Sequence, residues 1–164
     1  MEYATKLDVI TGAGSRKFGG RWNPPAQFCA VYAALDAETA FGESITTGDK
    51  YGISAAMRMP LVTVAIRAEL SRILDISAPQ IRKKLGVTMA AMTKTDWKAA
   101  QNRNQEAFTQ LLGRLAFEVG LEGLIVPSIY SRGRQNLVVF PERMLTTSRL
   151  EVVNGDMLPE GRGG

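Results

Sequence analysis

The sequence of 164 residues contains no histidine and a single cysteine, Cys29. Without histidine, the chain by itself forms no Ser-His-Asp triad, no Cys-His dyad and no histidine-ligated metal site. With one cysteine it forms no internal disulfide and no cysteine-built metal site, a pattern that fits a reducing cytoplasm. An enzyme of this composition must work with carboxylates, arginine, hydroxyls and backbone groups, and we expect no metal.

Long hydrophobic runs are lacking too. The most apolar segments, "LIVP" and "LVVF", have the length of a strand and are too short for a membrane span. The N-terminal "MEYATKLDVI" lacks the cationic start and apolar stretch of a signal peptide, so we expect a cytoplasmic protein without membrane contact. With 45% apolar and 22% charged residues, the composition is that of one globular domain.

The charge balance is mildly basic. Lys and Arg number 20 against 16 Asp and Glu, which gives a net charge of +4. This excess favours an anionic ligand or partner in general terms. The cations are scattered and form no long basic tract, so we expect no direct binding to nucleic acid.

Helical periodicity and capping residues predict three helices. Asp36 is placed to begin a helix over residues 36–45, because its carboxylate can accept hydrogen bonds from the first N–H groups. The segment 77–86 opens with the capping box "SAPQ" and ends on a glycine. The segment 88–103 has only modest helical character. A third helix over residues 104–120 ends on a glycine and carries an apolar face made of Phe108, Leu111, Leu112, Leu115 and Val119.

Apolar runs predict five strands, at residues 29–35, 60–70, 121–130, 136–142 and 150–155. The third and fourth are joined by the turn "SRGRQ" and are expected to pair as an antiparallel hairpin. The first twenty residues carry several glycines and little periodicity, which predicts irregular structure. We therefore expect a single α+β domain over residues 1–155 with a mixed, mostly antiparallel sheet, and a flexible tail at 156–164.

The segment "SRKFGGRWNPP" at residues 15–25 has a mixture of residues that a hydrophobic core does not need. Gly19 and Gly20 allow a close backbone approach or a positive φ, and the two prolines stiffen the exit. Arg21 offers five donors in a planar fork that suits a phosphate or a carboxylate. Trp22 would hold the segment against the core. On chemistry alone, a surface turn whose arginine pairs with a nearby acid explains the same residues.

Further polar and aromatic residues stand out along the chain. Tyr32 lies in the first predicted strand, and Glu43 lies late in the following helix, where it opposes the macrodipole and is not placed for helix stability. Ser128 ends one predicted strand and Asn136 begins the next. Taken singly, each is better explained by the commoner structural role, a solvated glutamate or a hydroxyl that satisfies a backbone group.

Three blocks in order resemble the signature motifs of the RES-domain family: "GAGSRKFGGRWNPP", "VYAALDAETAFGE" and "GLIVPSIYSRGRQNLVVF". The resemblance runs from residue 12 to residue 140. It includes the equal spacing of Arg21, Tyr32 and Glu43, and Ser128 occupies the position of the family's serine. RES proteins are toxin components of type II toxin–antitoxin modules, so the resemblance implies an NAD-consuming enzyme with a fold similar to ADP-ribosyltransferase toxins.

The implied activity is that of an NAD glycohydrolase or phosphorylase, which cleaves the nicotinamide–ribose bond by hydrolysis or phosphorolysis and arrests growth. Two alternatives stay open: an ADP-ribosyltransferase that modifies a host protein, and a catalytically weak relative that acts through binding. The resemblance implies NAD as a substrate and no bound cofactor, with inorganic phosphate as a candidate co-substrate. The implied partner is an Xre-like antitoxin, and a homo-oligomer is left open.

The chemistry of the residues agrees with this implication. Loss of nicotinamide develops positive charge on the ribose, which a carboxylate at Glu43 would stabilise, and neutral nicotinamide leaves without needing a histidine acid. Arg21 would bind a ribose hydroxyl or the pyrophosphate, and Tyr32 would stack on the nicotinamide or orient Glu43. Ser128 would bond to the carboxamide or to a ribose hydroxyl. The expected substrate-binding residues are Gly20, Trp22, Ser128 and Asn136.

The sequence departs from the family pattern at its start. Relatives commonly carry an aromatic–arginine pair in an opening strand well before the loop arginine. Here that point falls at Met1 and no such pair is present, so either the chain starts late or another residue substitutes. The departure predicts weaker affinity for NAD and an incomplete sheet edge that would favour pairing with a partner.

Overall fold

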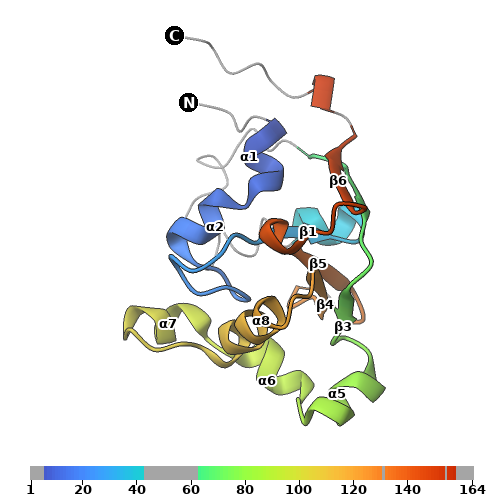
Figure 1. Ribbon diagram of the computed structural model, residues 1–164. Helices are drawn as coiled ribbons and strands as arrows, with labels where there is room; N and C mark the ends of the chain where they lie inside the picture. The colour runs from blue at the N-terminus through green and yellow to red at the C-terminus, as the bar shows by residue number, and fades with distance from the viewer. Residues whose placement is uncertain (1–5, 43–62, 131, 154, 158–164) are drawn as a thin grey trace.

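A computed structural model describes residues 6–42, 63–130, 132–153 and 155–157. Glu43, the remainder of the helix predicted at 36–45, and most of the predicted tail lie outside these residues. Among the described residues, six strands form two sheets (Figure 1). The strands are β1 (Val31–Ala34), β2 (Ile66–Glu69), β3 (Ile73–Asp75), β4 (Gly123–Pro127), β5 (Gln135–Val139) and β6 (Arg149–Val152).

The larger sheet has the strand order β1-β5-β4-β3. β5 pairs antiparallel with both β1 and β4, and β3 joins β4 in parallel. β2 and β6 form a separate antiparallel pair. The sheet is therefore mixed and mostly antiparallel, and the predicted β4–β5 hairpin is confirmed. The side chains on both faces of β4 are largely buried, as expected for a strand in the interior of the sheet.

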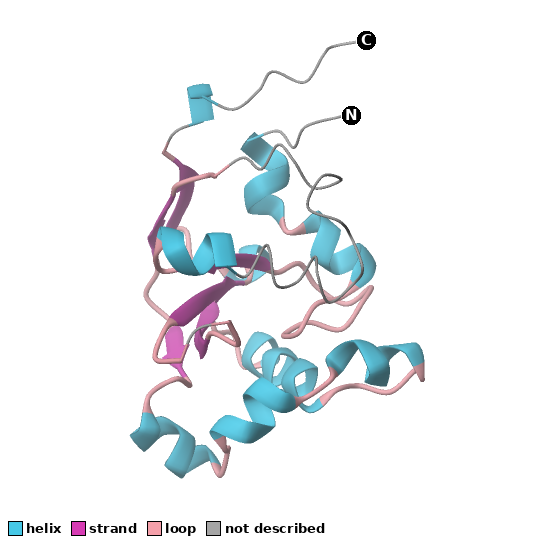
Figure 2. Cartoon of the chain, turned by 180° about the vertical axis from the view of Figure 1, so that it is seen from behind, coloured by secondary structure: helices cyan, strands magenta, loops and turns pink. Residues whose placement is uncertain are grey.

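The helices form two groups around the larger sheet, one containing α1 and α2 and the other containing α5 to α8 (Figures 1 and 2). α6 and α8 pack against β4, whereas α1 contacts β1 and β6. A further helical stretch covers residues 37–42. The named helices are α1 (Lys6–Thr11), α2 (Ala13–Phe18), α5 (Pro79–Leu85), α6 (Met89–Lys94), α7 (Trp97–Asn102) and α8 (Phe108–Glu118), with short 3₁₀ turns at Pro141–Arg143 and Gly155–Met157.

The prediction of irregular structure over the first twenty residues is wrong, because α1 and α2 form there. Gly12 separates the two helices with a φ of 67°. The hydroxyl of Ser15 donates to the carbonyl of Gly12 (2.8 Å) and accepts from the N–H of Ala30 (2.7 Å), which ties α2 to the segment before β1. Helices this short depend on such tertiary contacts more than on propensity, so periodicity did not reveal them.

The weakly helical segment 88–103 forms two short helices, α6 and α7. Each begins after a residue whose side chain accepts a hydrogen bond from the first turn. The Thr88 hydroxyl accepts from the N–H of Ala91, and the Asp96 carboxylate accepts from the N–H of Ala99, both at 3.1 Å. These caps compensate for the short length of the helices.

The helix predicted at 77–86 is confirmed as α5, but its capping box is wrong. The helix begins at Pro79, which has no N–H to cap, and the N-cap residue is Ala78 without a side-chain hydrogen bond. The hydroxyl of Ser77 instead donates to the carboxylate of Asp75. Gly86 ends the helix in the left-handed region with a φ of 67°, as predicted.

The helix predicted at 104–120 is confirmed as α8, but most of its predicted apolar face is exposed, although Leu112 packs against the core. Phe108 and Leu115 are exposed, and Val119 is 74% exposed. The fully buried positions are Thr109, Gln110, Gly113 and Ala116, and Phe117 packs partly buried against the core. Small and hydrogen-bonding residues face inward because α8 approaches the backbone of another segment closely.

Three phenylalanines from separate segments pack together, with Phe28 and Phe140 fully buried and Phe117 partly buried against them. The rings of Phe28 and Phe117 stack with their centroids 4.3 Å apart. Phe140 meets both rings edge-on, at 5.3 and 5.9 Å. Such contacts join the segment before β1, helix α8 and the end of β5, and add to the burial of large apolar area.

Glu122 is a fully buried carboxylate directly before β4. Its Oε2 accepts hydrogen bonds from the N–H groups of Ser71 and Arg72, both at 2.8 Å, and its Oε1 accepts from the N–H of Leu145 at 3.0 Å. Burial opposes ionisation, but the hydrogen bonds outweigh it and lower the pKa of Glu122 to about 2. One side chain thus connects the turn before β3, the start of β4 and the segment after β5.

We predict that Glu122→Gln lowers the free energy of unfolding by roughly 2 to 4 kcal/mol at pH 7, because the amide nitrogen faces backbone donors. Since the folded pKa lies below the ordinary value of 4.5, the contribution of Glu122 is present above pH 4.5 and is lost as the pH falls toward 2. Urea denaturation of both proteins across this range measures the difference. The exposed Glu118→Gln should change stability by less than about 1 kcal/mol, and an equal loss in both variants would contradict the assignment.

Candidate functional site

A cavity of about 1040 Å³ opens between β1, helix α7 and the loop that follows α2. Its volume is at the upper end of the range for small-molecule sites, about 300–1000 Å³. Residues 19–25 are called the arginine loop below. The structure brings five of the residues predicted for the site into the lining of this cavity: Gly20, Arg21, Trp22, Tyr32 and Asn136.

The register of the sheet places Tyr32 and Asn136 on one face. Tyr32 pairs with Val138, and Asn136 pairs with Ala34, so Tyr32 and Asn136 are diagonal neighbours across β1 and β5. Such neighbours are separated by about 7–8 Å. Val126 of β4, opposite Asn136, also lines the cavity. A phenol and an amide from adjacent strands therefore share one wall.

The hydroxyl of Tyr32 holds the arginine loop against the sheet. It donates to Oδ1 of Asn23 (2.8 Å) and accepts from the N–H of Trp22 (2.9 Å). Burial of the hydroxyl raises the pKa of Tyr32 well above its usual value, so the phenol stays protonated and remains a donor. The residue as a whole is still 42% exposed, which leaves ring surface available in the cavity.

Glycine is required at positions 19 and 20 of the loop for two different structural reasons. Gly19 adopts a positive φ of 72°, which residues with a side chain rarely take. Gly20 passes so close to Tyr32 that a Cβ there would lie 2.4 Å from the hydroxyl oxygen. Trp22 is buried in the core, so the prediction that it holds the loop against the core is confirmed.

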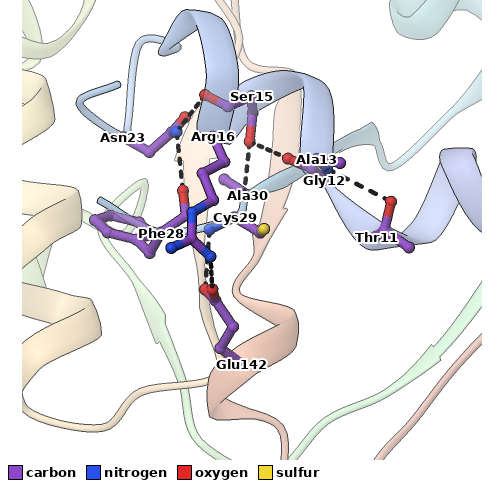
Figure 3. Close-up of polar contacts among 10 residues, drawn as sticks. All are labelled: Thr11, Gly12, Ala13, Ser15, Arg16, Asn23, Phe28, Cys29, Ala30 and Glu142. Carbon is purple, nitrogen blue, oxygen red and sulfur yellow. Dashed lines mark hydrogen bonds and ion pairs between the residues drawn. The ribbon is translucent and has the colours of Figure 1, made fainter. Parts of the chain in front are cut away.

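Two buried amides that the sequence analysis missed hold the loop from inside. The amide of Asn23 donates to the carbonyl of Ser15 at 2.9 Å (Figure 3). Gln110 of α8 donates to the carbonyl of Gly20 at 3.0 Å and accepts from the N–H of Ala107 at 3.1 Å. Neither amide could be found from the sequence, because a buried Asn or Gln differs from an exposed one only in its hydrogen-bond partners.

Figure 3 shows how α2 is fixed beside this loop. Arg16 forms an ion pair with Glu142 at 3.2 Å, and the other oxygen of Glu142 accepts from the N–H of Cys29 at 2.9 Å. Cys29 is half-buried, and the pKa of its thiol is raised, chiefly by burial. The contacts attach α2 to the turn after β5.

Arg21 is oriented by the C-terminal end of α6. Its Nη1 donates to the carbonyls of Met92 (3.1 Å) and Thr95 (3.0 Å). A cation beside the last carbonyls of a helix also interacts favourably with the negative end of the helix dipole. The guanidinium is therefore held in position while the side chain lines the cavity.

Ser128 lies beside the cavity lining. Its N–H donates to the carbonyl of Arg134 at 2.9 Å, which continues the β4–β5 ladder, and its hydroxyl accepts from the N–H of Tyr130 at 3.0 Å. It is 6% exposed, whereas its neighbours Pro127 and Ile129 line the cavity. The structure thus brings Ser128 close to the predicted set without placing it in the wall.

Glu43, the carboxylate assigned to catalysis, lies outside the described residues. The helix before it begins as predicted, since the carboxylate of Asp36 accepts from the N–H of Thr39 at 2.8 Å, and this hydrogen bond lowers the pKa of Asp36. Arg134 of the β4–β5 turn pairs with Asp36 at 3.3 Å and with Glu38 at 2.9 Å. The cationic turn is thereby attached to the start of this helix.

Comparison of the sequence with known proteins shows the family to which the chain belongs. The model of the RES domain matches residues 3–156, and the chain belongs to the RES domain family. The NAD(+) phosphorylases MbcT of Mycobacterium bovis and Mycobacterium tuberculosis are 33% identical over 135 residues, which cover 77% of this chain and 70% of each relative. The family membership predicted from the three sequence blocks is confirmed.

A solved structure is similar over most of the chain. The M. tuberculosis MbcT-MbcA toxin–antitoxin complex matches with a TM-score of 0.69 at 26% identity, covering 92% of this chain and 78% of the matched chain. The predicted single α+β domain with a mixed sheet is confirmed by this match and by the strand order. Within the part of the chain that the structure describes, no helix has the length and apolar character needed to cross a membrane.

The contact between α8 and the arginine loop gives a stability prediction. A Cβ at Gly113 would lie 1.7 Å from the carbonyl oxygen of Trp22, so Gly113→Ala should lower the free energy of unfolding by about 1–3 kcal/mol or more. Gly14 of α2 has nothing within 4 Å of the added Cβ, and Gly14→Ala should be neutral or stabilise by up to about 1 kcal/mol. Thermal and urea denaturation compare the two, and equal effects would argue against the close contact.

Proposed function

We propose that this chain is the toxin of a toxin–antitoxin module and cleaves the nicotinamide–ribose bond of NAD. The observation that carries the proposal is the shared cavity, in which Arg21, Tyr32 and Asn136 meet within a member of the RES domain family. The relatives named NAD(+) phosphorylase support the reaction, and the similar toxin solved together with MbcA supports an antitoxin as the partner. The proposed place of action is the cytoplasm, where NAD is shared by many enzymes.

The proposed chemistry uses Arg21 and Tyr32, whose charge does not change near neutral pH. Arg21 binds the pyrophosphate or a ribose hydroxyl with donors that its contacts to α6 have already oriented. Tyr32 offers its ring to the nicotinamide, because its hydroxyl is engaged by the arginine loop. Asn136, with Gly20 and Trp22, shapes the wall, and Ser128 supports the adjacent turn.

Glu43 is proposed to stabilise the oxocarbenium-like ribose as nicotinamide departs. It is the only part of the proposed machinery that rests on the sequence motif alone. The assignment follows from its position directly after the helical residues 37–42, whose first residues carry cavity-lining side chains. The acceptor proposed for the ribose is inorganic phosphate, following the name of the relatives.

The first test measures nicotinamide released from NAD by the purified protein in the presence and absence of phosphate. Wild type should release nicotinamide, and Glu43→Gln should lower kcat at least about 100-fold, the usual loss when one electrostatic group of a transition state is removed. Glu118→Gln, on the exposed side of α8, should keep full activity. No release by wild type under either condition contradicts the reaction, and full activity of Glu43→Gln contradicts only the role of that residue.

The second test identifies the acceptor. With phosphate present, we expect an ADP-ribose carrying a new phosphate on the ribose carbon that held nicotinamide, detected by mass spectrometry and ³¹P NMR. Unmodified ADP-ribose at all phosphate concentrations would indicate hydrolysis instead. Label from adenine-labelled NAD that appears in a discrete protein band of a lysate would indicate ADP-ribosyl transfer.

A further inference from the structure

Two aromatic residues border the same cavity away from the core. Phe18 ends α2 and is 61% exposed, and Trp97 begins α7 and is half-buried. Both line the cavity that also contains Tyr32 and Arg21. Neither ring belongs to the buried core, and aromatic surface that lines a cavity is typical of a ligand-binding site.

Phe18 and Trp97 are attached to the same short stretch of backbone. The amide of Gln101 donates to the carbonyl of Phe18 at 2.9 Å, and a Cβ at Gly19 would lie 2.3 Å from the side-chain oxygen of Gln101. Trp97 precedes Gln101 by four residues on α7, so the two side chains lie on one face of that helix. Trp97 therefore lies on the side of α7 from which Gln101 contacts Phe18 and Gly19.

Each ring has a lysine beside it. The ammonium of Lys17 lies 5.1 Å from the centroid of Phe18, and that of Lys98 lies 5.2 Å from the centroid of Trp97. Both distances are within the range of a cation–π contact. Flat π surfaces combined with cations are what nucleotides require, because bases stack on aromatic rings and phosphates bind the cations.

The arginine loop connects this surface to the proposed reaction site. Gly20 lies against the hydroxyl of Tyr32, and Phe18 precedes Gly20 by two residues, a separation of at most about 7 Å along the chain. Arg21, on the other side of Gly20, lines the cavity next to them. The cavity therefore has Tyr32 and Arg21 in one region and Phe18 and Trp97 in the adjacent region.

We propose that Phe18 and Trp97, the aromatic pair, form the binding surface for the adenine base of the dinucleotide, with Arg21 of the same cavity available to its phosphates. This inference rests on the proposed function and names the part of the site that recognises the half of NAD that does not react. It makes the enzyme selective for dinucleotides over a nicotinamide mononucleotide. The aromatic pair then contributes to binding of the substrate and leaves the chemistry of the ribose unchanged.

The test compares NAD with nicotinamide mononucleotide, which has the same scissile bond but no adenine, in Phe18→Ala, Trp97→Ala and Trp97→Phe. Loss of base stacking changes affinity by roughly 5- to 150-fold. We expect KM for NAD to rise within this range in both alanine variants, with kcat and all constants for the mononucleotide unchanged and Trp97→Phe close to wild type. Phe108→Ala, an exposed aromatic residue of α8 outside the cavity lining, is the matched control.

A second measurement, calorimetric titration with AMP, does not depend on turnover. Wild type and Phe108→Ala should bind AMP, and both alanine variants should bind it at least fivefold more weakly. If wild type cleaves no NAD but shows this pattern with AMP, the proposed reaction fails and the adenine site stands. Three results would overturn the inference. They are an equal loss of activity toward NAD and the mononucleotide, kinetic constants for NAD that are unchanged in both alanine variants, and no binding of AMP to wild type.

Discussion

The hydrogen bond from the hydroxyl of Tyr32 to Asn23 is the contact on which the site depends. It joins the first strand of the sheet to the arginine loop, and the same hydroxyl accepts from the backbone of Trp22. Asn23 in turn reaches back to α2, and Gln110 reaches in from α8. Because all of these groups are buried or partly buried, each lost partner would leave another polar group unsatisfied, so the contacts stabilise one another.

The ionisable side chains in the described lining of the cavity keep one charge state through neutral pH. Arginine is always protonated, the pKa of Tyr32 is raised by burial, and the pKa of Asp36 is lowered by hydrogen bonds from Thr39. This agrees with a chain that contains no histidine. Departure of a neutral leaving group suits such a site, because that step needs electrostatic stabilisation and no proton from a titrating acid.

Local patterns predicted a good part of this molecule. The β4–β5 hairpin, the cap at Asp36 and the end of α5 at Gly86 follow from turn signals, side-chain capping and positive φ, which are all properties of a few adjacent residues. The blocks of the family motif also located the arginine loop and β1, which meet at the cavity. In each case the information lay within a short segment of sequence.

What the sequence did not reveal depends on contacts between distant segments. Helices α1 and α2 have no apolar stripe and form where Ser15 meets Ala30. The inward face of α8 could not be read from hydrophobicity, because Gln110 and Gly113 face a polar backbone rather than an apolar layer. Asn23 and Gln110 look like ordinary polar residues until their partners are known.

The separation of these partners along the chain bears on when the protein becomes active during its synthesis. Gln110 bonds to a carbonyl 90 residues earlier, Arg21 to carbonyls 71 and 74 residues later, and β1 pairs with β5 near the end of the domain. Contacts of such long range form late, after the loops between them have closed. A nascent chain on the ribosome would thus carry Arg21 and Tyr32 without the surroundings that orient them, and the cavity would assemble only after β5 has been synthesised.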